Sequence, residues 1–317
     1  MMIFVFILLC IIGLAVFLYG IKIFSKTLKE YGENNIKKYL SKAVSNKYKG
    51  VLIGASFTAI VQSSSAVTVM LVSVAQASLL TVNETVGIIM GANIGTTITA
   101  WFVSFCNLDF NLPIPAIVII SLILFFVYLI LTFINKSKLS SIFLGLAMLL
   151  LGIFLMSNSM YIFKDFFISI KIFEYCKNPL VGMFVGVVLT AILQSSSVSV
   201  GVLQAMSATG AITFSVAIPF IAGVNIGSCV TALIATIGGN KNARATGLIH
   251  FYFNLIGSFV LLSAFYGVNI FMDYKFLNEY VNMLELTIVH TLFNVLTTII
   301  LLPFSNVLVK LSKRSVY

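Results

Sequence analysis

Two short polar motifs interrupt apolar parts of the sequence. Gln62-Ser-Ser-Ser65 and Gln194-Ser-Ser-Ser197 each lie near the middle of an apolar stretch, at about 50–80 and 179–209. A serine hydroxyl both donates and accepts hydrogen bonds, and the glutamine amide supplies a donor and an acceptor. Polar groups deep in an apolar segment are costly and often mark a functional site. The motifs are therefore the first candidates for a site that binds small ions.

The composition places these motifs in a membrane protein. Of 317 residues, 60% are hydrophobic and 9% are charged, with a mean hydropathy of +1.11. A soluble domain carries about 25% charged residues. The net charge of +10 could indicate nucleic-acid binding, but the basic residues form no compact face. The four scattered cysteines show no metal-binding spacing.

Seven apolar segments are long enough to cross a bilayer as helices of about 20 residues. They lie at about 3–24, 84–106, 113–134, 141–160, 213–236, 245–267 and 284–308. The first has no cationic start and no cleavage signature, so we expect a retained span. The two motif-bearing stretches are longer and are interrupted halfway, which favours pairs of half-helices that enter the membrane and return. The predicted fold is an all-α polytopic membrane protein with about seven full spans and two re-entrant helical hairpins.

The basic residues predict the topology. With the N-terminus outside, fifteen of the 19 Lys and Arg fall on the cytoplasmic side. Eight lie in 22–49, two in 135–140, two in 238–245 and three in the tail. This distribution follows the positive-inside rule. We therefore expect a plasma (inner) membrane protein with a cytoplasmic C-terminus, and an interfacial segment over 25–49.

An internal repeat relates the two motifs. Thr58 to Ser65 matches Thr190 to Ser197 at an offset of 132 residues, and the Gly91-Ala-Asn-Ile-Gly segment matches Gly223-Val-Asn-Ile-Gly at the same offset. A constant offset over several blocks indicates duplication. Three full spans precede the second copy, which would therefore enter the membrane from the opposite side.

Inverted-topology repeats are typical of transporters whose site lies near the membrane midplane. We expect the first repeat at 1–134, with a span, the interfacial segment, a hairpin and two spans. The second repeat is expected at 141–267, and 284–317 holds the last span and a short cytoplasmic tail.

The hairpin tips suit two kinds of ion. Half-helix N-termini attract anions, and the free carbonyls at half-helix C-termini suit a hard cation such as sodium. The candidate anion-binding residues are those of the two motifs: Gln62, Ser63, Ser64, Ser65, Gln194, Ser195, Ser196 and Ser197. The candidate sodium ligands add nearby polar residues to the motifs: Thr58, Gln62, Ser64, Asn93, Thr96, Thr97, Thr190, Gln194, Ser196, Asn225, Ser228 and Thr231. No Lys or Arg lies deep in an expected span, which favours an anion co-bound with cations.

Polar residues in membrane helices also serve as contacts between helices. This remains the alternative interpretation of both motifs. Two histidines on expected spans each lie four residues before an asparagine: His250 before Asn254, and His290 before Asn294. For these the preferred interpretation is a neutral histidine bonded to a neighbour. In contrast, Ser41 and Ser312 fall in flanking segments that we expect to be solvated.

Both QSSS motifs, the GxNIG segments that follow them and the HFYFN sequence at 250–254 resemble the sodium/phosphate cotransporter family (type II, with its bacterial relatives). The resemblance extends from about Gly13 to Asn294. It implies sodium-driven phosphate uptake by alternating access, with substrate and sodium sites at both QSSS tips. Sodium is then a co-transported ion, and no organic cofactor is expected.

Two departures from the family pattern stand out. The second copy reads Asn225-Ile-Gly-Ser-Cys229, so a thiol replaces a hydroxyl, which puts a ligand at that position in doubt. Many bacterial members carry a soluble C-terminal domain, and here the sequence ends at Tyr317. Regulation is therefore expected to be absent or to come from a separate phosphate-signalling protein. A homodimer is a further candidate assembly.

Other functions compete with this interpretation. A cation-coupled carrier of another small anion fits the same features. An intramembrane serine hydrolase would pair a motif serine with His250 or His290, but an enzyme needs one nucleophile and the motif is duplicated. An anion channel would not concentrate its substrate, because each negative charge entering at −100 mV costs about 2.3 kcal/mol. We therefore expect a transporter and not an enzyme.

Overall fold

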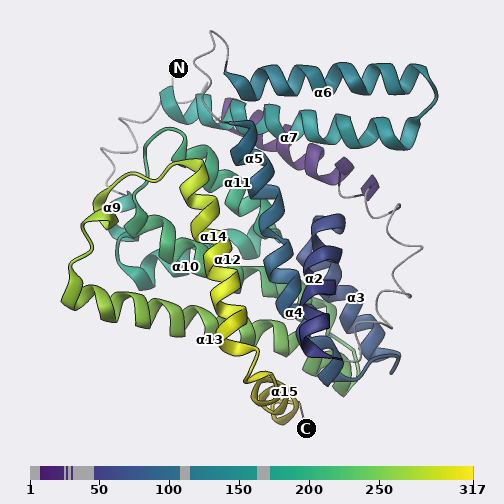
Figure 1. Cartoon of the computed structure of the whole chain (residues 1–317), viewed down its shortest axis with the longest axis vertical. Helices are drawn as coiled ribbons and strands as arrows, with labels where there is room; N and C mark the ends of the chain where they lie inside the picture. The colour runs from purple at the N-terminus through teal and green to yellow at the C-terminus, as the bar shows by residue number, and fades with distance from the viewer. Residues whose placement is uncertain are drawn as a thin grey trace.

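The computed structural model describes residues 8–24, 26–27, 30, 46–107, 115–162 and 172–316. Within this part of the chain the regular elements are helices, and one isolated antiparallel bridge joins Thr213 to Tyr280. The all-α prediction is confirmed. Besides the N-terminal helix Leu8–Phe24, the helices of Figure 1 are α2 Lys47–Val61, α3 Ser64–Gln76, α4 Val82–Gly95, α5 Thr97–Cys106, α6 Ala116–Phe133, α7 Ser137–Ile162, α9 Ile172–Cys176, α10 Pro179–Leu193, α11 Ser196–Ser207, α12 Phe214–Ala235, α13 Lys241–Met272, η1 Lys275–Asn278, α14 Met283–Leu301 and α15 Ser305–Arg314.

Six helical segments in the described residues are long and apolar enough to cross a membrane. They are Val82–Cys106, Ala116–Phe133, Lys138–Ser159, Phe214–Ala235, Lys241–Met272 and Met283–Leu301. They correspond to six of the seven expected spans. The start of the seventh, before residue 8, lies outside the described residues, and Leu8–Phe24 is a shorter apolar helix. Most of the expected interfacial segment 25–49 also lies outside them.

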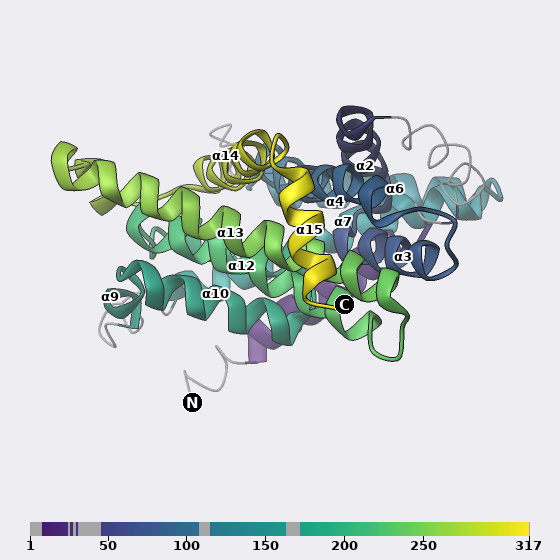
Figure 2. The same cartoon turned by 90° about the horizontal axis from the view of Figure 1, so that it is seen from below.

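The last span ends earlier than predicted. We expected it to continue to residue 308, but α14 ends at Leu301 and a new helix, α15, starts at Ser305. Pro303 has no backbone N–H and its ring crowds the preceding turn, so it cannot continue α14. The side-chain ammonium of Lys47 donates to the carbonyl of Leu302 across 3.1 Å. The chain then turns, and α15 packs across α13 (Figure 2).

The 132-residue offset recurs in the helix boundaries. At this offset α2 coincides with α10 at both ends, α3 and α11 begin together, and α4 and α12 begin together. Helix α2 packs tightly on α4, and α10 packs in the same way on α12. A Cβ on Gly91 would lie 1.9 Å from the Val51 carbonyl oxygen, and one on Gly223 would lie 2.0 Å from the equivalent oxygen of Met183. The two copies therefore share the same helix packing.

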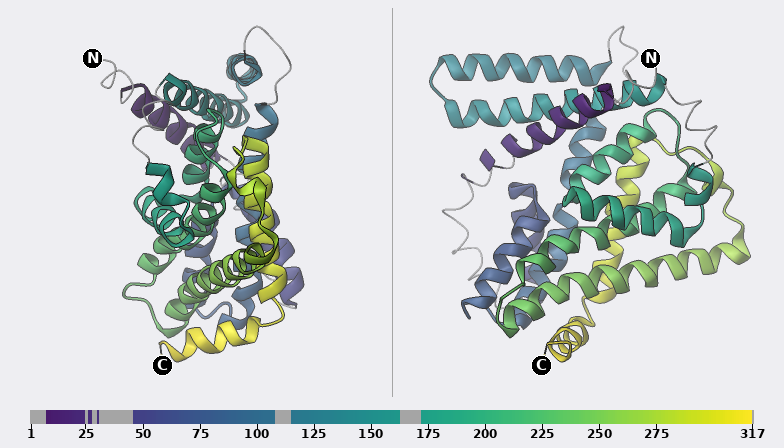
Figure 3. Two further views of the ribbon diagram at one scale, coloured as in Figure 1. Left: turned by 90° about the vertical axis from the view of Figure 1, so that its left-hand side faces the viewer. Right: turned by 180° about the vertical axis from the view of Figure 1, so that it is seen from behind.

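The N-terminal helix lies antiparallel beside α7 (Figure 3). A Cβ on Gly13 would lie 3.1 Å from the carbonyl oxygen of Gly152, and one on Gly20 would lie 2.8 Å from that of Gly145. Gly145 and Gly152 are the offset equivalents of Gly13 and Gly20. Gly13 thus contacts the equivalent of Gly20, and Gly20 contacts the equivalent of Gly13. This is the pattern of an isologous contact about a two-fold axis.

Helices α6 and α7 form an antiparallel pair at one side of the molecule (Figure 1). Only 11% of the apolar span Ala116–Phe133 is buried inside the protein. A large apolar surface of this kind marks contact with a membrane or another protein.

Candidate functional site

Both motifs break a helix in the same way. Gln62 ends α2 and Gln194 ends α10, each in the left-handed conformation, with φ of 57° and 52°. This conformation is uncommon for a residue other than glycine. The next residue caps the following half-helix: Ser63 accepts a hydrogen bond from the N–H of Ala66 at 3.1 Å, and Ser195 does the same for α11. The predicted interruption of each apolar stretch is therefore present.

The start of each second half-helix offers unpaired donors. Ser64 and Ser65 open α3, and Ser196 and Ser197 open α11, so their backbone N–H groups have no partner within the helix. The hydroxyls of these four serines also have no hydrogen-bond partner among the described residues. Each tip thus presents two N–H groups and two hydroxyls at the positive end of a helix dipole. An anion is the ligand that such an end stabilises.

The two glutamines differ in their contacts. The side-chain oxygen of Gln62 accepts a hydrogen bond from the hydroxyl of Thr99, and its amide donates to the carbonyl of Ala59. Gln194 is exposed, and its side chain makes no hydrogen bond within the described part of the chain. Thr231, the equivalent of Thr99, has a buried hydroxyl without a partner. The first tip is therefore tied to α5, and the second is not tied to α12.

Thr99 was not among the predicted sodium ligands, although its equivalent Thr231 was. The repeat offset was the signal that could have found it, because Thr99 and Thr231 lie 132 residues apart. Pairing equivalent positions systematically would therefore add Thr99 to the candidate site.

Thr58 and Thr190 are fully buried one turn before their glutamines. The Thr190 hydroxyl donates to that of Ser199 at 2.9 Å. In the first copy Val67 occupies the position equivalent to Ser199, and the Thr58 hydroxyl has no partner. A single sequence difference between the copies thus leaves Thr58 with an unused hydroxyl beside the tip.

The GxNIG segments place further oxygens in the protein interior. Asn93 and Asn225 are buried and donate through their amides to carbonyls one turn earlier, at 2.9 and 3.1 Å. Three predicted hydroxyls are also buried and donate to carbonyls three or four residues earlier: Thr96, Thr97 and Ser228. These hydrogen bonds use the N–H and O–H groups of the side chains. The side-chain oxygens keep lone pairs with which they could bind a cation.

Each second half-helix packs on the other copy of the repeat. Helix α3 of the first copy contacts α12 and α13 of the second, and α11 of the second copy contacts α5 of the first. Gln204 of α11 fixes one of these contacts, because its buried amide donates at 3.0 Å to the Ala100 carbonyl and to the hydroxyls of Ser104 and Thr287. Gln204 was not predicted from the sequence, where its only signal was a lone polar residue in an apolar stretch. No hydrogen bond between described residues joins the two motifs directly.

The bonded histidines expected from the sequence are not found among the described residues, although the asparagines of both pairs make hydrogen bonds. Asn254 donates to the sulfur of Cys229 at 3.2 Å, which joins α13 to α12, and Asn294 donates to the carbonyl of His290 in its own helix at 2.8 Å. Both imidazoles are fully buried, and none of their ring nitrogens has a partner in the described part of the chain. No hydrogen bond between described residues therefore joins a motif serine to a histidine. The described residues also hold no cluster of three metal-ligating side chains of the His, Cys, Asp or Glu type.

Comparison with known protein families connects these features to a function. A model of the Na+/Pi-cotransporter family matches residues 16–158 and 169–290. The chain belongs to the Na+/Pi-cotransporter family. The matched ranges include both motifs and both GxNIG segments, and the apolar helices fit a multi-pass membrane protein of a transporter family.

The similar proteins carry different functional names. The chain is 28% identical to "Uncharacterized protein YqeW" of Bacillus subtilis over 313 residues, 93% of each chain. It is 26% identical to "Putative inorganic phosphate export protein YjbB" of Salmonella typhimurium over 281 residues, 88% of this chain and 50% of that one. Human "Sodium-dependent phosphate transport protein 2B" is 36% identical over 91 residues, 27% of this chain and 13% of the human one. The chain therefore spans half or less of the relatives named for phosphate. No solved structure matches it.

Proposed function

We propose that the protein is a sodium-coupled phosphate transporter that imports phosphate by alternating access. The observation that carries this proposal is the pair of equivalent helix breaks at the QSSS motifs, each with unpaired N–H and hydroxyl donors. Two such tips supply eight donors to an oxyanion without a lysine or arginine. Phosphate carries one or two negative charges near neutral pH, and its oxygens accept several hydrogen bonds at once.

Sodium would bind where the oxygens gather. The C-terminal carbonyls of α2 and α10 and the buried side chains around Asn93 and Asn225 provide oxygen acceptors next to the tips. A cation bound there offsets the charge of phosphate in a desolvated site, where electrostatic attraction is stronger than in water. The resulting coupling makes each ion raise the affinity of the other.

The inverted arrangement of the repeats is part of the proposal. The contact of Gly13 with Gly152 and of Gly20 with Gly145 supports a two-fold relation between antiparallel, equivalent helices. If both helices cross the membrane, that axis lies in the membrane plane, and the two hairpins re-enter from opposite sides.

Contacts between the ends of helices support the topology. Segments that we expect on the cytoplasmic side contact one another: Lys313 donates to Asn83 at 3.3 Å and Asn240 donates to the carbonyl of Gln76 at 2.9 Å. On the expected outer side, the Ser104 hydroxyl donates to the carbonyl of Met283 at 2.9 Å. These contacts fit an N-terminus outside and a C-terminus in the cytoplasm.

The unequal tips support alternating access. Gln62 is held by Thr99, whereas Gln194 is exposed and the hydroxyl of Thr231 is unpaired. In a symmetric repeat, the opposite conformation would release the first tip and tie the second. Exchange between these two arrangements would open the site to each side in turn.

The direction of transport follows from the ion gradients. An inward sodium gradient drives a symporter inward, which is why we propose import. Export is the second candidate, because the similar Salmonella protein is named for phosphate export. Both directions use the same binding chemistry.

Phosphate flux in proteoliposomes tests the proposal. We expect uptake of radiolabelled phosphate by vesicles with an inward sodium gradient, and none above background when choline replaces sodium. Loading vesicles with phosphate and reversing the gradient then measures export in the same preparation. Flux that is equal in sodium and choline would refute coupling. No phosphate flux in either buffer would refute the substrate assignment.

A further inference from the structure

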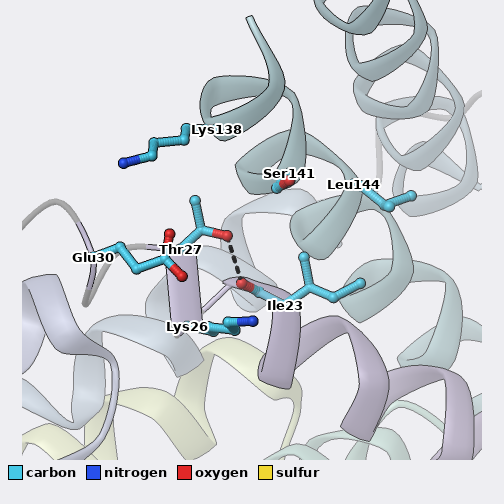
Figure 4. A pocket seen from close by; sticks show the side chains of 7 residues that line it. All are labelled: Ile23, Lys26, Thr27, Glu30, Lys138, Ser141 and Leu144. Atoms are coloured by element: carbon cyan, nitrogen blue, oxygen red, sulfur yellow. Dashed lines mark hydrogen bonds between the residues drawn. The ribbon is translucent and has the colours of Figure 1, made fainter.

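A pocket separate from both motifs lies where the N-terminal helix approaches the first turns of α7 (Figure 4). It has a volume of about 340 Å³. Lys26 and Lys138 line it from the two helices, and Ile23 and Leu144 form an apolar wall. Both helices meet the pocket at the ends of their apolar stretches, so it lies at the expected boundary of the hydrocarbon.

The remaining lining residues are polar. In Figure 4, Thr27 and Glu30 lie between the two lysines, and Ser141 faces them from α7. The Thr27 hydroxyl already donates to the carbonyl of Ile23 at 2.9 Å. The lysine ammonium groups are therefore the main donors for an anion. Glu30 opposes that charge.

Further lysines surround the pocket. Lys22 lies one turn before Lys26, and Lys136 lies in the turn that leads into α7, and both are exposed. Among the described residues, the neighbourhood thus carries four lysines against the one carboxylate of Glu30. Clusters of lysine next to apolar helices attract anionic lipid headgroups by about 1 kcal/mol for each lysine.

We propose that this pocket binds the phosphate group of an anionic membrane phospholipid. Lys26 and Lys138 contact the phosphate, and Ile23 and Leu144 contact the glycerol and the first acyl carbons. The apolar wall favours a lipid over free phosphate, which has no apolar part to bury. A lipid held by both lysines bridges the N-terminal helix to α7, the two helices related by the repeat. It therefore stabilises their packing.

Native mass spectrometry of the full chain in detergent tests the proposal. With equal amounts of phosphatidylglycerol and phosphatidylcholine, we expect the wild type to retain phosphatidylglycerol at least tenfold more strongly. Lys26→Gln and Lys138→Gln should each weaken that preference about fivefold, whereas Lys310→Gln, an exposed lysine of α15, should leave it unchanged. Equal retention of the two lipids, or a preference unaffected by the double variant Lys26→Gln/Lys138→Gln, would overturn the proposal.

Glu30→Gln provides a test that does not depend on a loss of binding. Removal of the opposing carboxylate should strengthen phosphatidylglycerol retention several-fold, and an unchanged or weaker retention contradicts the site.

A second experiment uses inorganic phosphate. If millimolar phosphate stabilises the protein in a way that depends on Lys26 and Lys138, and phosphatidylglycerol has no effect, the pocket is reassigned to free phosphate. Sodium-dependent flux in phosphatidylcholine vesicles should persist in the lysine variants, which separates this proposal from the transport function.

Discussion

The hydroxyl of Thr99 donates a hydrogen bond to the side-chain oxygen of Gln62, and this bond ties the first motif to α5. The equivalent residues of the second copy, Thr231 and Gln194, make no such bond, and the Thr231 hydroxyl is buried without a partner. Identical residue types at equivalent positions therefore have different roles in this conformation. The difference gives a matched pair of substitutions.

Thr99→Val and Thr231→Val should have different effects on stability. Val has the shape of Thr without the hydroxyl, so Thr99→Val leaves the oxygen of Gln62 unpaired at a cost of about 1–3 kcal/mol. Thr231→Val removes a buried hydroxyl that has no partner and should be neutral or stabilising. Thermal unfolding in detergent measures both. Equal destabilisation by the two variants would show that the bond between Thr99 and Gln62 is not a specific link.

The motif serines should control ion affinity. Ser64→Ala or Ser196→Ala removes one unpaired hydroxyl from a buried tip and should cost about 1–3 kcal/mol of phosphate binding, or ten- to hundredfold in affinity. Protein abundance should change little, because the substitution leaves the apolar packing intact. Ser73→Ala is the matched control, since Ser73 lies in α3 but is exposed and donates within its own helix. Normal uptake by both tip variants would make the motifs packing contacts.

Ser73 is a better control than Ser41 and Ser312, the two serines that the sequence places in flanking segments. Ser312 was expected in a solvated segment, but it is fully buried and donates to the carbonyl of Val309 at 2.9 Å. Its burial follows from the packing of α15 on α13, which Pro303 sets up by ending α14. Ser41 lies outside the described residues.

The breaks at Gln62 and Gln194 could be predicted, because a cap and a polar run act locally. The choice of Thr99 over Thr231 as a partner could not, because both lie at equivalent positions of the repeat and the outcome depends on how the hairpins pack. Pro303 could have predicted the end of α14, but the apolar residues around it favoured a span that continues to residue 308. The role of Gln204 depends on α5 and α14, which are distant in the chain, so it could be found only in three dimensions.

Sodium and phosphate should each raise the affinity of the other by the same factor. This reciprocity is a requirement of thermodynamic linkage, and the tips place anion donors next to cation acceptors. Isothermal calorimetry in sodium and in choline buffers measures the phosphate affinity directly. An affinity that is unchanged between the two buffers would contradict a shared site.

Cysteine labelling should confirm the two-sided arrangement. With an impermeant thiol reagent, Arg314→Cys should react only from the cytoplasmic side and Lys275→Cys only from outside, since both positions are exposed. The native Cys176 is nearly buried, and burial raises the pKa of its thiol. Because the thiolate is the reactive form, Cys176 should label slowly at neutral pH and faster as the pH rises. Labelling of positions 275 and 314 from the same side would refute the topology.

Gln204 should be a structural link between the copies rather than a ligand. Its amide donates to three acceptors on α5 and α14, all from a buried position on the second hairpin. Gln204→Leu preserves the volume but leaves those acceptors buried with fewer donors, so we expect a loss of about 2–3 kcal/mol of stability. The same change should leave the intrinsic sodium dependence of phosphate binding intact in the folded fraction.

The equivalent residue in α3 is Val72, which is buried and has no side-chain hydrogen bond to offer, so the first copy packs without such a link. Val72→Leu is therefore the matched control, and it should cost less than Gln204→Leu in thermal unfolding. A Gln204→Leu protein with normal stability and altered sodium dependence would instead assign Gln204 to the ion site.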